Sequence, residues 1–249
     1  MSNARRKEIV KLIAEIKIKY NVSIPVIFDR AYEDIIHNQE LEPRISALSF
    51  DDNNVVFEVG TFSKLLLRLL ELVMCYRRIL KYLNLLDQVV SDIGFSAPLI
   101  NQEITAWLLT HYIKTQLQFV NSAYREKAFV LSEFLNATLE HRLINMYGGD
   151  AGFYFYMTLC VPTHKESSFY KFLSRTTGNV EIDGNGEKLP RLIYIPGAIC
   201  IQNEDLKRSL GNYQLRISYG FELIEQLKQA VVLIRDAVDY ALMKELSDK

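Results

Sequence analysis

Residues 54–64 read Asn-Val-Val-Phe-Glu-Val-Gly-Thr-Phe-Ser-Lys, and this stretch decides the fold. Its apolar first half predicts a short buried strand over residues 54–59, stopped by the glycine that follows. Thr61, Ser63 and Lys64 then place two hydroxyl groups and an ammonium group directly after the strand. Ligands of open α/β sheets bind at the carboxyl ends of the strands, so these three residues are candidate site residues.

A second buried strand is predicted upstream, at Ile24-Pro-Val-Ile-Phe28, after an amphipathic helix over residues 5–19. This strand ends at Asp29, which stands 35 residues before Lys64 and is a further candidate for the site. Short apolar strands with helices between them are typical of an α/β layer. Taken singly, Asp29 is also explained as the cap of a following helix and Lys64 as a solvated loop charge.

The rest of the chain predicts mostly helix and then a small α+β domain. Residues 65–90 are rich in leucine and read as helix for much of their length, with strand left open for residues 65–76. Residues 99–140 predict one nearly continuous helix. After it, we predict a strand over 153–159, a helix near Phe169 and a polar loop over 176–188. Two strands, over 191–195 and 214–219, and a final helix over 221–246 follow. We therefore predict two domains, 1–120 and 121–249, with the boundary inside the long helix.

The composition excludes several classes of function. The 249 residues are 49% hydrophobic and 24% charged, which is typical of a packed globular protein. The net charge of −1 provides no broad basic field, so we expect neither nucleic acid nor a membrane surface as a partner. The most apolar stretch, residues 65–74, contains two charged residues and is too short to span a membrane.

The three cysteines, Cys75, Cys160 and Cys200, lie far apart and form no CxxC motif. This spacing predicts neither a disulfide framework nor a metal site. We expect reduced thiols in an apolar core, and no signal peptide, and therefore a cytoplasmic protein.

Several motifs occur together and in a recognisable order. Asp29-Arg-Ala-Tyr32 is followed by Gly60-Thr-Phe-Ser-Lys64, and five further segments accompany this pair. Together they resemble the class I/II (fold type I) pyridoxal-phosphate-dependent aminotransferases over almost the entire chain, and most closely the MocR or aminoadipate-type branch. The five segments are Met1–Lys11, Ser96-x-Pro98 with Gln102, Gly148-Gly-x-x-Gly-Phe153, Pro196-Gly197 and Arg216-Ile-Ser218.

The resemblance implies pyridoxal 5′-phosphate as the cofactor and a role for each matching residue of the central motif. Lys64 is the Schiff-base lysine, which afterwards moves the substrate proton as general base and acid. Asp29 pairs with the protonated pyridine nitrogen and keeps the ring an electron sink. Tyr32 donates a hydrogen bond to the 3′ oxygen of the ring.

The resemblance also implies how charged groups of the ligands are held. Thr61 and Ser63 bind the cofactor phosphate, and Arg216 binds the substrate α-carboxylate with its planar fork. The arginine that binds this phosphate in the family is replaced by Glu71, a carboxylate that repels a phosphate, while Arg68 stands three residues earlier. This difference predicts weakened cofactor binding.

The fold class implied is α/β, as a partial fold type I transferase: a remnant of the mostly parallel large-domain sheet (1–120) plus a C-terminal α+β small domain (121–249). The front part of the family's large domain has no counterpart here, so the chain resembles a truncated, C-terminal part of an aminotransferase. The activity implied is amino-group transfer from an amino acid to a 2-oxo acid, in a homodimer or with a complementing N-terminal half. The alternative is a non-catalytic remnant or interaction module, or one half of a split enzyme.

Overall fold

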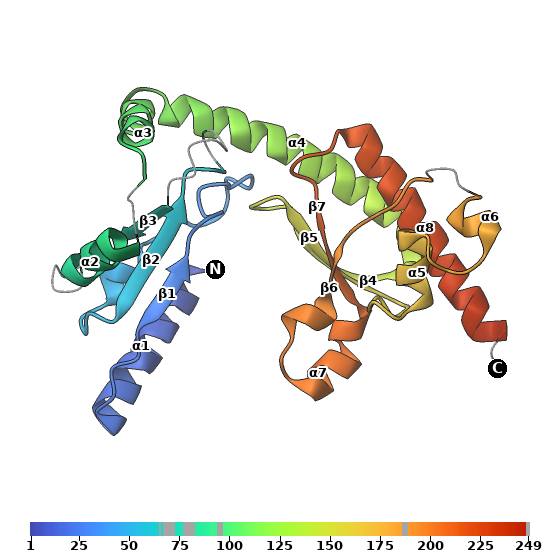
Figure 1. Ribbon diagram of the computed structural model, residues 1–249, viewed down its shortest axis with the longest axis horizontal. Helices are drawn as coiled ribbons and strands as arrows, with labels where there is room; N and C mark the ends of the chain where they lie inside the picture. Colours follow the sequence, from blue (N-terminus) through green and yellow to red (C-terminus); the bar gives the residue numbers. More distant parts are fainter. Residues whose placement is uncertain (65, 67–72, 77–82, 94–96, 186–188, 248–249) are drawn as a thin grey trace. The chain divides into compact units, whose positions relative to one another are not determined.

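The chain divides into two compact units, Met1–Asn121 and Ser122–Lys249. The computed structural model describes residues 1–64, 66, 73–76, 83–93, 97–185 and 189–247 (Figure 1). Each unit combines helices with a β-sheet, which confirms the α/β class that the sequence predicts. Within the described ranges, no helix is long and apolar enough to cross a membrane, and no group of three or more His, Cys, Asp or Glu side chains is arranged to hold a metal ion.

The first unit is built on a three-stranded sheet with the order β1-β2-β3. Strands β1 (Val26–Asp29) and β2 (Val56–Thr61) pair in parallel, with Asp29 opposite Val59. Strand β3 (Val73–Tyr76) pairs with β2 in the antiparallel direction. The mixed sheet therefore places the carboxyl ends of β1 and β2 at one edge.

Helix α1 (Asn3–Tyr20) precedes the sheet, close to the predicted range of 5–19. It begins where the Ser2 side chain accepts a hydrogen bond from the backbone N–H of Arg5, and it ends at Asn21 in the left-handed region. Its buried Val10 joins a small core with Phe28 and Val56. Two further helices follow the sheet, α2 (Leu83–Ile93) and α3 (Leu99–His111).

Strand β2 continues through Gly60 to Thr61, so the prediction that this glycine ends the strand is wrong. The reason is that Gly60 pairs with Met74 of β3, which keeps the backbone extended. A Cβ atom at Gly60 would make only ordinary contacts, at 3.9 Å from Arg30 Cβ and from Met74 Cε. The strand therefore carries the polar side chain of Thr61 on its last residue.

Four charged side chains form a buried network that joins α1, β1 and β2. Arg30 Nη1 donates to Glu58 Oε2 over 2.6 Å, and Arg30 also pairs with Glu33, which in turn pairs with Arg6. The side chains of Glu58 and Arg6 are only 1% and 3% exposed. Glu58 Oε1 also accepts the backbone N–H of Ala47 over 2.6 Å. Each charged side chain of this network therefore pairs with a side chain of opposite charge, as buried ions require.

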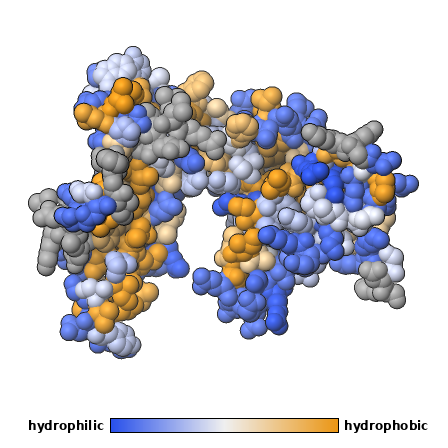
Figure 2. All heavy atoms as spheres, viewed as in Figure 1, coloured by the Kyte–Doolittle hydropathy of each residue, from blue (hydrophilic) through white to orange (hydrophobic). Residues whose placement is uncertain are grey.

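One face of this sheet carries exposed apolar side chains. Figure 2 shows hydrophobic residues gathered along β1 and β2. Ile27 of β1 is 67% exposed and Val73 of β3 is 71% exposed. Parallel strands are normally covered on both faces, so this exposure is unusual for a parallel pair.

The second unit is an antiparallel sheet with helices packed on one face. Its four strands are ordered β4-β5-β7-β6. Their bounds are β4 Leu143–Gly148, β5 Tyr154–Leu159, β6 Ile195–Pro196 and β7 Gln214–Ser218. Its helices are the part of α4 (Ile113–Leu139) from Ser122 onward, α5 (Ser168–Ser174), α6 (Val180–Asp183), α7 (Glu204–Ser209) and α8 (Ile224–Ser247) (Figure 1). Its 3₁₀ turns are Glu140–Arg142, Gly197–Cys200 and Gly211–Tyr213.

The period-2 alternation of β5 and β7 separates the two faces of this sheet. Phe155, Met157, Leu215 and Ile217 are buried in one core with the apolar sides of α4, α5 and α8. The alternate residues, including Arg216, lie on the opposite face.

Three predicted segments differ from the structure. The helix over 99–140 is broken at Tyr112, where α3 ends and α4 begins. The predicted loop 176–188 contains the short helix α6, whose first turn is capped by Asn179. The predicted strand 191–195 is reduced to Ile195–Pro196, because only these two residues pair with β7.

The cysteines are free, and two of them contradict the prediction of core thiols. Cys75 and Cys200 are exposed, because one lies on the edge strand β3 and the other ends a surface 3₁₀ turn. Cys160 is half-buried, and burial raises the pKa of its thiol.

The buried network predicts a large loss of stability in Glu58→Gln. The amide keeps the shape and the acceptor for Ala47, but it leaves two arginines with one carboxylate. We expect the free energy of unfolding of the first unit to fall by about 3–5 kcal/mol. Urea unfolding followed by the fluorescence of Trp107, which belongs to this unit, measures the change.

The matched control is Lys11→Met, which removes an exposed ion pair to Glu15. It is expected to change stability by less than about 1 kcal/mol. A Glu58→Gln loss as small as that of the control would show that the network does not stabilise the unit.

Candidate functional site

The ends of β1 and β2 bring together the residues that the sequence predicts for the site in the first unit. Asp29 is the last residue of β1 and Thr61 the last of β2. The pairing extends one residue further, because the N–H of Arg30 donates to the carbonyl of Val59 over 2.7 Å. Both polar side chains therefore follow the same parallel pair at the same edge, as expected for a ligand site.

The turn after β2 gathers two hydroxyl groups. Thr61 Oγ1 donates to Ser63 Oγ over 2.9 Å and accepts the backbone N–H of Ser63 over 3.1 Å. The N–H of Leu66 donates to the carbonyl of Phe62, which closes the next turn. Two hydroxyl groups next to the backbone N–H groups of consecutive turns are suited to bind an oxyanion.

Lys64 and Tyr32 lie on two different segments and meet at this edge. Lys64 Nζ lies 5.8 Å from the centroid of the Tyr32 ring. Tyr32 stands in the turn after β1, where its carbonyl accepts the N–H of Ile35 over 3.2 Å. The structure thus brings the predicted lysine and tyrosine into contact range of one another.

Asp29 holds the turn that carries Tyr32. Its Oδ1 accepts the backbone N–H of Ala31 over 2.9 Å. This is a local, turn-forming role, close to the capping role that the sequence also suggests for Asp29. In the part of the chain that the structure describes, Oδ2 accepts no hydrogen bond. One carboxylate oxygen of Asp29 therefore fixes the turn.

Arg216 belongs to the second unit, on the sheet face opposite the core. Its guanidinium lies over the ring of Tyr154, 4.5 Å from Cζ to the ring centroid. Tyr156 stands directly opposite it on β5. Nε of Arg216 is buried, and among the described residues it has no hydrogen-bond partner. The predicted site residues thus form two groups, one in each unit.

Two tyrosines beside Arg216, Tyr154 and Tyr156, are not among the residues predicted for the site. Tyr156 Oη donates to Gln214 Oε1 over 3.0 Å, and Gln214 Nε2 donates to Thr158 Oγ1 over 3.3 Å. The signal for Tyr154 and Tyr156 was the alternation of β5, which places every second residue on the face of Arg216.

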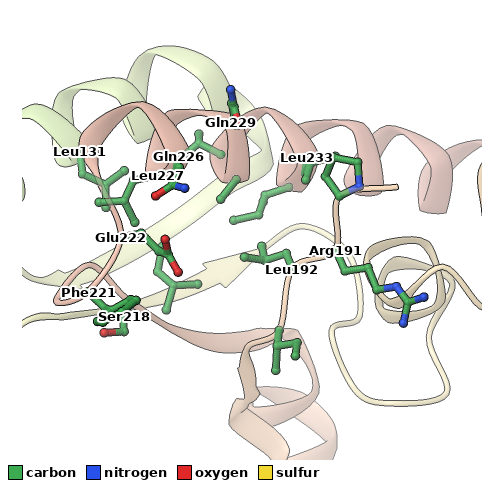
Figure 3. A pocket seen from close by; sticks show the side chains of 16 residues that line it. Leu131, Arg191, Leu192, Ser218, Phe221, Glu222, Gln226, Leu227, Gln229 and Leu233 are labelled. Atoms are coloured by element: carbon green, nitrogen blue, oxygen red, sulfur yellow. The ribbon is translucent and has the colours of Figure 1, made fainter. Parts of the chain in front are cut away.

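A cavity of about 490 Å³ also lies in the second unit, between α8, residues 190–193 and the end of β7 (Figure 3). Figure 3 shows Leu192 and Leu227 directed into it, while Gln229 and Arg191 point away. None of the predicted site residues lines this cavity. Three further residues that the sequence singled out, Arg68, Glu71 and Ser96, lie outside the described residues.

Solved structures with the same fold are aminotransferases. The LysN α-aminoadipate aminotransferase of Thermus thermophilus matches 96% of this chain with a TM-score of 0.72 and 20% identity. The multiple substrate aminotransferase of Thermococcus profundus matches 98% with a TM-score of 0.75 and 17% identity. The kynurenine aminotransferase of Pyrococcus horikoshii matches 96% with a TM-score of 0.73 and 15% identity.

The chain has a partial fold type I aminotransferase fold. It covers only 54%, 53% and 52% of those three proteins, so it spans about half their length. The resemblance that the sequence motifs indicate is confirmed at the level of the fold. No family model and no curated protein matches the chain.

Within this aminotransferase fold, Gly197 is fixed by its surroundings. A Cβ atom there would lie 2.4 Å from Gln214 Cβ and 2.8 Å from Tyr156 Oη. The glycine therefore allows the turn after β6 to approach the Gln214–Tyr156 hydrogen bond, on the sheet face that carries Arg216.

We expect Gly197→Ala to lower the free energy of unfolding of the second unit by about 1–3 kcal/mol. The added methyl group fits only if the turn at Gly197 moves away from Gln214 of β7. Thermal unfolding measured by circular dichroism gives the difference. Gly60→Ala is the matched control, because its Cβ atom meets nothing closer than 3.9 Å. Equal stability of the two variants would contradict the close packing at Gly197.

Proposed function

We propose that this chain is part of a pyridoxal-phosphate-dependent aminotransferase that moves an amino group from an amino acid to a 2-oxo acid. The observation that carries the proposal is the meeting of Lys64 and Tyr32, beside the Thr61–Ser63 hydroxyl pair, at the carboxyl ends of two parallel strands. This cluster stands in a fold whose solved examples are aminotransferases. The Thermus structure holds N-(5′-phosphopyridoxyl)-L-leucine and the Pyrococcus structure holds PMP.

The residues at this edge fit pyridoxal 5′-phosphate in the chemistry of their donors. The hydroxyl groups of Thr61 and Ser63 suit its phosphate, and the second oxygen of Asp29 suits its pyridine N–H. The phenol of Tyr32 suits the ring 3′ oxygen. When bound, the cofactor supplies an electron sink for the α-carbon of the amino acid.

The proposed reaction assigns the proton transfer to Lys64. Its amine is the group that removes the proton from the α-carbon and returns it, and an amine at such a site serves as both base and acid. Arg216 is proposed to bind the α-carboxylate of the substrate through two parallel N–H···O bonds. What supports this role is that Nε of Arg216 is buried and has no hydrogen-bond partner among the described residues.

The organisation proposed follows the two units. Residues 1–120 are taken as a remnant of the large cofactor-binding domain and residues 121–249 as the small domain. We propose that a second copy of the chain, or a complementing N-terminal half, completes the site in the cytoplasm. The exposed apolar face of the three-stranded sheet supports a partner of this kind, because Ile27 and Val73 would otherwise face water.

Lys64→Ala tests the catalytic assignment. The protein is incubated with pyridoxal phosphate and reduced with borohydride, and the labelled peptide is identified by mass spectrometry. We expect stoichiometric label on Lys64 in the unchanged chain and its loss in the variant, because this lysine stands beside Tyr32 and the hydroxyl pair.

The control is Lys7→Ala, which removes an exposed lysine of α1 in the same unit. It should retain the full label. Label that persists in Lys64→Ala, or that spreads evenly over exposed lysines, would remove Lys64 from the proposed role.

A second candidate function is that of an interaction module, or half of a split enzyme, without activity of its own. The observation that favours it is the apolar cavity between α8 and residues 190–193, whose rim exposes large side chains. Ile193 is 92% exposed and Phe221 is 84% exposed. Exposed apolar groups around a groove are typical of a surface that binds another chain.

The double variant Ile193→Lys with Phe221→Lys tests this second function. If the groove binds another chain, two charges at its rim should lower the affinity for that chain at least about tenfold, because lysine head groups resist burial. Sedimentation of the protein alone, and with a separately produced N-terminal half of an aminotransferase, measures the association. The exposed pair Leu206→Lys and Met243→Lys is the control. Unchanged association in the rim variant would exclude the groove as the binding surface.

A further inference from the structure

Among residues that the structure describes, the guanidinium of Arg216 lacks polar partners of the kind that three other arginines of its unit have. Arg142 forms two hydrogen bonds with Asp239, and Arg235 pairs with Asp236. Arg175 donates to the carbonyls of Pro190 and Ile182. For Arg216, the contact found within the described residues is the aromatic ring of Tyr154, at 4.5 Å.

The immediate neighbours of Arg216 offer it little hydrogen bonding. On one side stands Tyr156, whose hydroxyl is engaged with Gln214. On the other side stands Ile195 of β6, directly opposite in the register. Nε of Arg216 is buried without an acceptor in the described part of the chain. A cation in such a place gains more from an incoming anion than it would in open water, because fewer competing dipoles surround it.

The ring of Tyr154 is itself held in place. It lies 4.7 Å from the ring of Phe153, centroid to centroid, and Phe153 stacks on Tyr124 of α4 at 5.5 Å. The backbone of Tyr154 pairs with Ser218, two residues from Arg216 on β7. The aromatic surface under the guanidinium therefore belongs to the rigid sheet and its helix.

We propose that Tyr154 is a positioning residue for the carboxylate site, acting through Arg216. This inference rests on the proposed role of Arg216 in binding the substrate carboxylate. A guanidinium that lies over an aromatic face keeps its N–H groups directed sideways, where a carboxylate accepts two of them at once. The ring thus removes rotational freedom from the long arginine side chain before the substrate arrives.

The experiment titrates the full chain with pyruvate and follows the Nε–H resonance of Arg216 by nuclear magnetic resonance. Pyruvamide, which lacks the charge, serves as the comparison ligand. We expect Tyr154→Leu to weaken pyruvate binding about three- to tenfold, the size of a cation–π contact, and to shift the resonance in the free protein. Tyr154→Phe should keep both properties within about twofold, because it retains the ring.

Two further variants complete the test. Tyr147→Leu changes an exposed tyrosine of β4 in the same sheet and should leave pyruvate binding unchanged. Tyr154→Thr offers a second ring deletion with a strand-favouring residue, should the leucine variant fold poorly.

The outcomes separate this inference from the proposed function. If Arg216→Gln abolishes binding while both ring deletions bind as the unchanged chain does, Arg216 holds the carboxylate and the role of Tyr154 is wrong. If the unchanged chain shows no saturable response to pyruvate, the carboxylate site and the positioning role both fail. They also fail if the Arg216→Gln variant binds pyruvate with the same affinity as the unchanged chain. Parallel losses in Arg216→Gln and the ring deletions, with Tyr154→Phe intact, establish the inference.

Discussion

The carboxylate of Glu58 is buried in the first unit, and the arrangement of β1, β2 and α1 depends on the ion pairs that neutralise it. Arg30 reaches it from the residue after β1, and Glu33 links Arg30 to Arg6 of α1. A buried carboxylate without these partners would cost several kcal/mol, so the two strand ends must stay close together. The same closeness brings Asp29 and Thr61 to one edge, where the candidate cofactor site lies.

The second unit reaches its organisation by a different route. The strict alternation in β5 and β7 gives one face to a large apolar core and the other to polar and aromatic side chains. On the second face, Gly197 permits a close approach, Arg216 lies over the ring of Tyr154, and Tyr156 stands opposite Arg216 on β5.

Much of this architecture follows from local patterns in the chain. The apolar runs before Asp29 and Gly60 predict the two strands. The motifs resemble those of aminotransferases, whose fold the matching solved structures share. The errors lie where pairing or packing overrides local preference. Gly60 continues a strand because β3 pairs beside it, and the segment 191–194 is not a strand because β7 pairs only with Ile195 and Pro196.

The sequence by itself determined the fold class and most of the helices and strands, because these follow from periodicity. The resemblance of its short, contiguous motifs named the candidate residues Asp29, Tyr32, Thr61, Ser63 and Lys64. Only the tertiary structure decided which side chains meet. The contact of Lys64 with Tyr32 and the ring of Tyr154 under Arg216 join residues that are 32 and 62 positions apart. Such contacts depend on strand register and packing, which no local pattern encodes.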